Sequence, residues 1–481
     1  PPGHLVQLFH VGHVCPHRHR KRNPAVQQGV ENMGIVGAGR NTERQGGQGL
    51  RHIFLTLTAG GWQGYLHSFE GTKTVPPLAP HGADPHTIPT QDRATAPVQG
   101  FFMLDAKYYA NLGLSSIREK VLAGERLSHD DGLALFACKD ITAVGALALH
   151  VRCRRHGHKT FYVVNRQINY TNVCVNGCTF CAFRRDSEAE PGAFSLSIEE
   201  VLDRLRAADA TPLHLDELHI VGGCHPARPL AWFEAMLQKV RAFNPRLPLK
   251  AFTAVEIEHF SRLEGISTLE VLQRLQKSGL VMMPGGGAEI FDEEVRRQIC
   301  PHKADAASWL RIAGEAHSLG IKTNCSMLFG HLESTEHRID HLCRLREQQD
   351  KSGGFTCFIP LPFLTENSRL KLPEDKTGPQ RGLDQLRTVA VSRLMLDNIP
   401  HIKAYWIMLA PKLAPVALWY GADDLDGTIV EEHIGHMAGA QSAQSMTIAE
   451  LEHLIRSSGF VPVRRNATFV PLPDAQESRG Q

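Results

Sequence analysis

The sequence predicts an α/β fold, a full or partial (β/α) barrel of the TIM type with a helical segment before it. From about residue 160, a short apolar stretch is followed by a helical pattern of roughly ten to fifteen residues, and this alternation repeats six or seven times. The stretch 160–420 has about the length that a complete barrel requires. Glycine-rich and polar loops follow the predicted strands, where barrel enzymes carry their catalytic groups.

The predicted strands are 161–168, 217–221, 250–253, 280–283, 322–329, 356–360 and 402–408. Helical patterns lie between them at 197–208, 229–243, 267–277, 305–318, 335–350 and 382–397. An open doubly wound sheet has the same alternation and is the alternative. In both folds the functional loops follow the carboxyl ends of the strands.

The regions that flank the barrel have different patterns. Amphipathic stretches at 115–123, 129–138 and 141–155 predict a helical N-terminal segment over 103–158, with Ser128 as a helix N-cap. Residues 1–100 contain 25 glycines and prolines and show neither helical nor strand periodicity. We therefore predict a disordered leader over 1–102, with Met103 as the native start, a barrel over 159–420, and a C-terminal segment over 421–481 that packs on it.

Composition excludes several classes of function. The chain has 481 residues, of which 42% are hydrophobic and 21% charged, as in ordinary globular proteins. No run of about 18 apolar residues predicts a membrane span, and a formal charge of +2 does not indicate a nucleic-acid partner. The 11 cysteines are odd in number and scattered, which argues against a disulfide framework. A site of three thiolates, Cys174, Cys178 and Cys181, implies a reducing compartment, and we therefore expect the cytoplasm. Nothing in the sequence indicates an oligomeric state.

The most informative motif is a run of three cysteines, Cys174, Cys178 and Cys181, with C-x3-C-x2-C spacing. Three thiolates can hold a four-iron cluster and leave one iron without a protein ligand, open to a substrate or cofactor. A structural zinc site is the alternative, but it needs four protein ligands and no second cysteine or histidine pair is evident. Cys153 lies upstream among arginines and is a poor fourth ligand.

This loop, with Phe180 before its last cysteine, resembles the cluster loop of the radical S-adenosylmethionine (SAM) superfamily. Two further runs, Ala-Phe-Thr-Ala-Val-Glu-Ile at 251–257 and Pro-Gly-Gly-Gly-Ala-Glu-Ile-Phe at 284–291, are similar to its menaquinone branch, the futalosine pathway. That branch contains aminofutalosine synthases and dehypoxanthine futalosine cyclases, and the two runs are most similar to the synthases. The resemblance covers about 103–470.

The resemblance implies a transferase with a 4Fe-4S cluster and SAM as co-substrate, reduced by a donor such as flavodoxin or ferredoxin. A synthase of this branch adds the 5'-deoxyadenosyl radical to a small aryl enol-ether dicarboxylate, 3-[(1-carboxyvinyl)oxy]benzoate. It forms 6-amino-6-deoxyfutalosine, bicarbonate and methionine. The alternatives are a cyclase or another radical SAM enzyme that abstracts hydrogen, and a non-catalytic zinc or iron-sulfur protein.

Residue type and position make individual residues candidates for roles in the reaction that the resemblance implies. The three cysteines are the cluster ligands, and the candidates for cofactor binding are Phe180, Gly222, Gly223, Glu256 and Glu289. The candidates for catalysis are Glu256, His331 and Glu333. The candidates for substrate binding are Arg184 and His225. Each has a simpler interpretation. A glycine pair after a strand forms a turn, charged residues form surface or structural ion pairs, and the run 333–336 is typical of a helix cap.

Overall fold

The computed structural model describes residues 53–58, 61–66, 104–209, 214–376 and 381–473. The chain divides into two compact units, Pro1–Asp92 and Arg93–Gln481. In the first, strands β1 (Ile53–Thr58) and β2 (Gly61–Leu66) form an antiparallel hairpin. The predicted disordered leader falls mostly outside the described residues and stays a prediction.

The second unit begins with four helices, α1 (Ala106–Asn111), α2 (Ser115–Ala123), α3 (His129–Ala137) and α4 (Ile141–His156). The hydroxyl of Ser128 accepts a hydrogen bond from the backbone N–H of Asp131, and the Asp131 carboxylate accepts one from the N–H of Ser128. This reciprocal pair is a capping box. It confirms Ser128 as the predicted N-cap.

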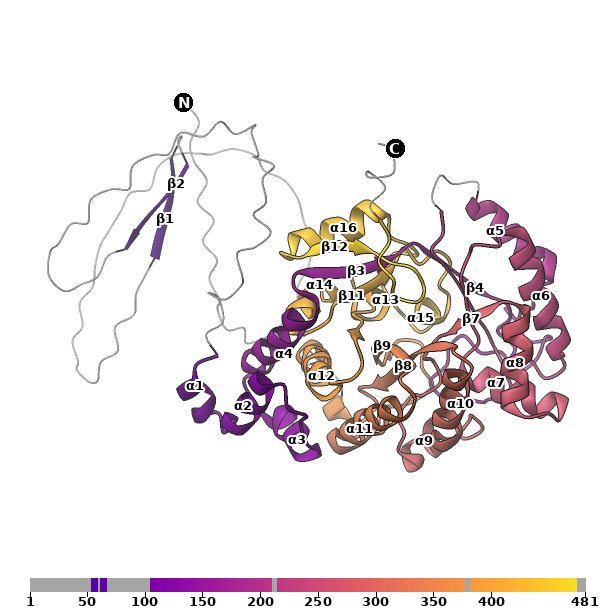
Figure 1. The fold of residues 1–481 in the computed structure, drawn as a ribbon, viewed down its shortest axis with the longest axis horizontal. Helices are drawn as coiled ribbons and strands as arrows, with labels where there is room; N and C mark the ends of the chain where they lie inside the picture. The colour runs from indigo at the N-terminus through magenta and orange to yellow at the C-terminus, as the bar shows by residue number, and fades with distance from the viewer. Residues whose placement is uncertain (1–52, 59–60, 67–103, 210–213, 377–380, 474–481) are drawn as a thin grey trace, which may run out of the picture. The chain divides into compact units, whose positions relative to one another are not determined.

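A sheet of seven parallel strands follows, in the order of the chain. Its strands are β4 (Asn165–Asn169), β5 (Glu217–Val221), β6 (Leu249–Ala251), β7 (Leu280–Met283), β8 (Lys322–Phe329), β9 (Phe355–Pro362) and β10 (His401–Ile402). The helices between them are α5 (Ile198–Asp209), α6 (Leu230–Phe243), α7 (Ala254–Glu264), α8 (Thr268–Ser278), α9 (Glu293–Ile299), α10 (Ala306–Ser318), α11 (Thr335–Ser352) and α12 (Arg381–Met395). Figure 1 shows these helices around a curled sheet. The predicted (β/α) fold is confirmed as a partial barrel.

Two predicted strands differ from the structure. The stretch 161–168 is divided into β3 (Lys159–Val163) and β4, because the N–H of Val164 donates to the Asp216 carboxylate (3.0 Å) and leaves the ladder. Strand β3 joins a small second sheet between β11 (Asp424–Gly427) and β12 (Val461–Arg464). The stretch predicted at 402–408 is a two-residue strand followed by helix α13 (Trp406–Leu409).

The chain after β10 spans the gap between the two edges of the large sheet. On one side, the N–H of Ala404 donates to the carbonyl of Asp424 (2.8 Å); on the other, the N–H of Gln167 donates to the carbonyl of Val430 (2.9 Å). The remaining C-terminal elements are α14 (Ala414–Ala417), α15 (Ile434–Met437), α16 (Ile448–Ser457) and β12. The C-terminal segment therefore contributes to the barrel wall.

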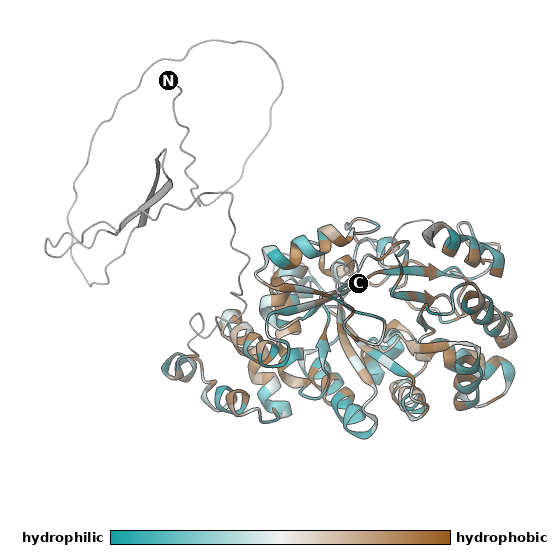
Figure 2. Cartoon of the chain, turned by 45° about the horizontal axis from the view of Figure 1, so that its top comes forward, coloured by the Kyte–Doolittle hydropathy of each residue, from teal (hydrophilic) through white to brown (hydrophobic). Residues whose placement is uncertain are grey.

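The core lies between the sheet and its helices. Large side chains such as Phe233, Phe252, Phe260 and Trp309 are almost fully buried there. The surrounding helices carry both hydrophilic and hydrophobic residues, as amphipathic helices with one apolar face do (Figure 2). Within the part of the chain that is described, no helix combines the length and the apolar character that crossing a membrane requires.

Candidate cofactor and substrate cavity

A cavity of about 320 Å³ lies where the loops after the parallel strands converge. Nine of the residues singled out in the sequence line it, namely Cys174, Cys178, Phe180, Cys181, Arg184, Gly222, Gly223, Glu256 and Glu289. They come from the loops after β4, β5 and β7 and from the start of α7. The carboxyl ends of neighbouring parallel strands meet at one edge of the sheet, which explains why these distant residues lie together.

The cysteine loop is fixed by backbone hydrogen bonds to three other segments. The N–H of Cys174 donates to Arg185 (3.0 Å), that of Val175 to Cys224 (3.1 Å) and that of Thr179 to Ile299 (2.9 Å). Cys178 is buried, and Cys174 and Cys181 are partly buried. The three thiols are therefore held on a rigid loop at the cavity wall.

The glycine pair after β5 packs directly against this loop. A Cβ on Gly223 would lie 2.2 Å from the carbonyl oxygen of Val173, and one on Gly222 would lie 2.8 Å from the Tyr170 ring. The N–H of Gly223 also donates to the carbonyl of Thr171 (2.8 Å). Only glycine permits this close approach of the two loops.

The number of thiols on this loop suits a cluster better than a single metal ion. Cys174, Cys178 and Cys181 line the cavity. A structural zinc ion needs four protein ligands, whereas three thiolates can hold a 4Fe-4S cluster because each binds a different iron. The donor set therefore fits the cluster.

The thiols differ in their electrostatic surroundings. A hydrogen bond from the Cys224 thiol lowers the pKa of Cys174 to about 5, whereas burial raises the pKa of Cys178 to about 12. The positive charge of Lys303 acts in the opposite direction to burial at Cys178 and Cys181. The loop thus contains one thiol that is ionised readily and a nearby cation that stabilises the other thiolates.

Lys303 was not singled out from the sequence. Its ammonium group lies 2.6 Å from the Glu289 carboxylate and 5.3 Å from the centre of the Phe180 ring. All three residues line the cavity. The cysteine-rich loop and the loop after β7 are thus joined by an ion pair and a cation–π contact.

Glu256 has a structural role that the sequence motif did not reveal. It is the third residue of the capping box at the start of α7, where it accepts hydrogen bonds from the N–H and hydroxyl of Thr253 (2.7 and 2.8 Å). Its other oxygen accepts from the Tyr170 hydroxyl (2.7 Å) and the Gly222 N–H (3.2 Å). Burial raises the pKa of Glu256 to about 7. Glu256 therefore helps to position the glycine loop, and both of its carboxylate oxygens accept hydrogen bonds from other residues of the protein.

Arg184 and His225, the predicted substrate contacts, occupy different places. Arg184 lines the cavity and forms an ion pair with the exposed Asp186. His225 is not among the lining residues, and its Nε2 lies 3.0 Å from a carboxylate oxygen of Glu188. The structure brings Arg184, but not His225, to the cavity.

The predicted catalytic pair, His331 and Glu333, also lies outside the cavity lining. The Glu333 carboxylate accepts from the N–H groups of Gly330 (2.6 Å) and His331 (2.8 Å) and pairs with Arg338 (2.8 Å). These contacts close the turn after β8 and bury both side chains fully. The geometry gives the pair a structural role, because these contacts hold the turn together, and leaves the catalytic role a prediction.

The barrel interior contributes polar groups that the sequence analysis missed. Six of them line the cavity from strands, namely Gln167, His219, Lys250, Asn324, Ser326 and Asp426, and Lys403 and Tyr405 line it from the segment after β10. Lys250 and Lys403 each stand between two apolar residues, whereas Gln167 and Asn324 have polar neighbours. A polar residue at an inward position of a buried strand was the available signal, since such positions are normally apolar.

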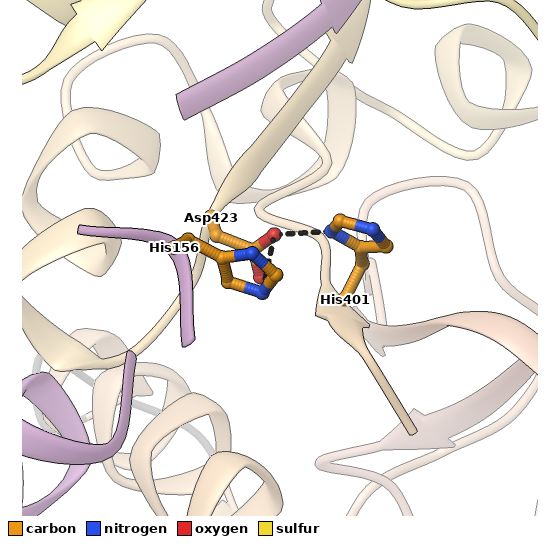
Figure 3. Close-up of side chains that lie close together, drawn as sticks. All are labelled: His156, His401 and Asp423. Atoms are coloured by element: carbon orange, nitrogen blue, oxygen red, sulfur yellow. Dashed lines mark hydrogen bonds and ion pairs between the residues drawn. The ribbon is translucent and has the colours of Figure 1, made fainter. Parts of the chain in front are cut away.

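A second group of metal-ligand types, His156, His401 and Asp423, lies outside this cavity (Figure 3). The two imidazole rings are stacked, with centroids 4.7 Å apart and planes at 18°. A metal ion must lie near the plane of each ligating ring, which two nearly parallel rings do not permit. Asp423 is also paired with Arg393. This group is therefore a structural cluster.

Comparison with known proteins gives matches along most of the chain. Residues 168–345 match the model of the radical SAM superfamily, and residues 352–477 match the model described as CofH/MqnC C-terminal region. An aminodeoxyfutalosine synthase from Thermus thermophilus is 46% identical, over 74% of this chain and 95% of that protein. One from Streptomyces coelicolor is 42% identical, over 73% and 92%.

Other similar proteins have different names. A 5-amino-6-(D-ribitylamino)uracil–L-tyrosine 4-hydroxyphenyl transferase from Methanopyrus kandleri is 38% identical, over 71% of this chain and 93% of that protein. Among solved structures, methylornithine synthase matches with a TM-score of 0.59 at 18% identity, over 72% of this chain and 97% of that one. The latter similarity concerns the fold alone.

Proposed function

The chain belongs to the radical SAM superfamily, as a relative of the aminodeoxyfutalosine synthases, and on this basis we propose that it catalyses the synthase reaction. In that reaction the adenosyl group of SAM is joined to the enol-ether carbon of 3-[(1-carboxyvinyl)oxy]benzoate. Rearrangement and loss of the enol carboxyl group as bicarbonate, with consumption of one water, give 6-amino-6-deoxyfutalosine and methionine.

The residues of the cavity have separate tasks in this proposal. Cys174, Cys178 and Cys181 hold the cluster, which when bound supplies the electron that cleaves the sulfonium bond of SAM. The backbone at Gly222 and Gly223 allows SAM to approach the cluster closely. A small one-electron carrier such as flavodoxin or ferredoxin is the proposed reductant, and the reducing cytoplasm is the proposed location.

The observation that carries the proposal is the position of the cysteine loop and the glycine pair on one wall of the same cavity. The sequence runs 251–257 and 284–291 lie at that wall as well, through Glu256 and Glu289. The greater identity to the two synthases than to the hydroxyphenyl transferase favours the synthase reaction.

Product analysis by mass spectrometry tests this function. The reconstituted and reduced protein is incubated anaerobically with SAM and 3-[(1-carboxyvinyl)oxy]benzoate. A product that contains both the adenosyl and the benzoate groups, formed together with methionine, is expected. Free 5'-deoxyadenosine as the only nucleoside product would instead indicate hydrogen abstraction, as in the sister cyclases. A parallel incubation with L-tyrosine and the ribitylaminouracil tests the transferase alternative.

A further inference from the structure

Three adjacent strands place a row of polar side chains inside the barrel. In the parallel pairing, Gln167 of β4 is opposite His219 of β5, and His219 is opposite Lys250 of β6. Register partners in a sheet project from the same face, and all three residues line the cavity. The row therefore presents an amide, an imidazole and an ammonium group to the same space.

The ring of His219 has one nitrogen that the described residues leave without a hydrogen-bond partner. This atom, Nε2, is buried. Burial lowers the pKa of His219 to about 3, and the neighbouring Lys250 acts in the same direction, so the ring is neutral. A neutral imidazole still has one N–H donor and one acceptor. A buried ring nitrogen without a partner beside a cavity is costly unless a ligand contacts it.

The cations near this row are only partly occupied by protein carboxylates. The Lys250 ammonium pairs with Glu217 (2.5 Å), and the Lys403 ammonium lies 3.0 Å from Asp426 and 3.6 Å from Asp424. An ammonium group has three donors. These contacts account for one donor of Lys250 and at most two of Lys403, and both side chains line the cavity.

An apolar wall lies in the same cavity. Ile359, Leu361 and Phe363, from β9 and the residue after it, are among the lining residues. A ligand suited to this space combines an aromatic ring with a carboxylate, because the ring contacts the apolar wall and the carboxylate accepts hydrogen bonds from the polar row.

We propose that Gln167, His219 and Lys250 form the binding site for one carboxylate of an aryl dicarboxylate substrate. The assignment rests on the proposed function for the identity of that substrate. The other carboxylate is left to other lining groups, such as Arg184. The polar row selects for a carboxylate over its neutral ester, since an ester removes the negative charge that Lys250 attracts.

Calorimetric titration of the cluster-loaded, unreduced protein with SAM present tests this site. The probe is 3-(1-carboxyethoxy)benzoate, the saturated analogue of the enol ether, together with its two monomethyl esters. The native protein is expected to bind the diacid at least about tenfold more tightly than one of the esters. His219→Phe is expected to weaken diacid binding about tenfold and to reduce this preference.

Two further variants keep the test decisive. Lys250→Met combined with Glu217→Leu removes both charges of the ion pair, so that no buried charge is left without a partner. This double variant should also lose the preference for the diacid over the monomethyl ester. His150→Phe is the matched control, because His150 on α4 also has a ring nitrogen without a partner among the described residues but does not line the cavity. It should bind like the native protein.

The outcomes separate this site from the proposed function. If folded, cluster-loaded His219→Phe and the double variant both bind the diacid as the native protein does, the carboxylate site is refuted, even if the synthase product forms. If the variants lose diacid binding but the native protein forms no adenosylated product, the site stands and the proposed reaction fails.

Discussion

Cys178 is the most deeply buried of the three cluster cysteines, with 5% of its surface exposed. Substitution of Cys178 by alanine removes one of three thiolates and is expected to abolish both cluster assembly and turnover. Iron content and product formation measure the effect. Cys343→Ala, a change on α11 outside the cavity, should retain both. Activity in Cys178→Ala would refute the cluster assignment.

The raised pKa of Glu256 predicts that the native protein and Glu256→Gln differ in how their stability changes with pH. Its pKa is about 7 in the folded protein, raised from 4.5 by burial. Between these values the folded protein binds more protons at this site than the unfolded chain, so its contribution is complete below pH 4.5 and is lost as the pH rises towards 7. Relative to Glu256→Gln, the native protein should lose up to about 1.4 kcal/mol per pH unit in this window.

Urea denaturation of the native protein and Glu256→Gln at pH 5 and pH 7.5 measures this difference, because shared titrations cancel in the comparison. An equal change in the free energy of unfolding for both proteins would show that Glu256 is ionised at both pH values.

At the residue scale, motif spacing and position predicted the cysteine and glycine loops of the cavity wall but not the groups of the barrel interior. The cysteines, the glycine pair and Glu289 could be found because they lie in loops next to predicted strand ends. Lys303, Lys250 and His219 could not be found in the same way. None of them belongs to a motif, and the groups that they contact or face are distant in the sequence. His331 and Glu333 follow a predicted strand, which is a position typical of catalytic residues in a barrel. Their burial by structural contacts depends on the tertiary fold and could not be predicted from the sequence.

The contact between the cysteine loop and the glycine loop is the critical feature at the element scale. A methyl group at Gly223 would lie 2.2 Å from the Val173 carbonyl oxygen. Gly223→Ala must therefore separate the loops, at a cost of about 1–3 kcal/mol, and should impair SAM binding and turnover. Equilibrium dialysis with labelled SAM and thermal unfolding measure both effects.

Gly382→Ala is the matched control for this substitution. Gly382 lies in α12, and a Cβ added there would meet no atom of the described residues within 4 Å. Alanine there should leave SAM binding unchanged and stabilise the helix by up to about 1 kcal/mol. Normal SAM binding by Gly223→Ala would contradict the proposed role of the loop contact.

The elements themselves were predicted with differing success. Strands β7 and β8 match the stretches predicted at 280–283 and 322–329, and their burial is nearly continuous. The division of 161–168 into two strands depends on Asp216 and on the distant chain around Thr428, which bonds to both Val163 and Asn165. Local sequence does not encode that interaction. Helix α7 was missed because its first turn was interpreted as a loop that followed a strand.

At the scale of the whole molecule, the sheet, its helices and the cavity all lie within the unit Arg93–Gln481. A chain that begins at Met103 is therefore expected to fold and to catalyse the reaction as the full chain does. Size-exclusion chromatography, thermal unfolding and product formation compare the two proteins. Loss of folded protein or of turnover in the shorter chain would show that residues 1–102 are required.

The central claim is that this cavity holds a three-thiolate cluster whose open iron binds SAM. Anaerobic analysis of iron and acid-labile sulfide, with electron paramagnetic resonance of the reduced protein, tests it most directly. About four irons and four sulfides per chain are expected, with a signal that changes when SAM is added. About one zinc per chain with no labile sulfide, or a cluster signal that SAM leaves unchanged, would contradict the account.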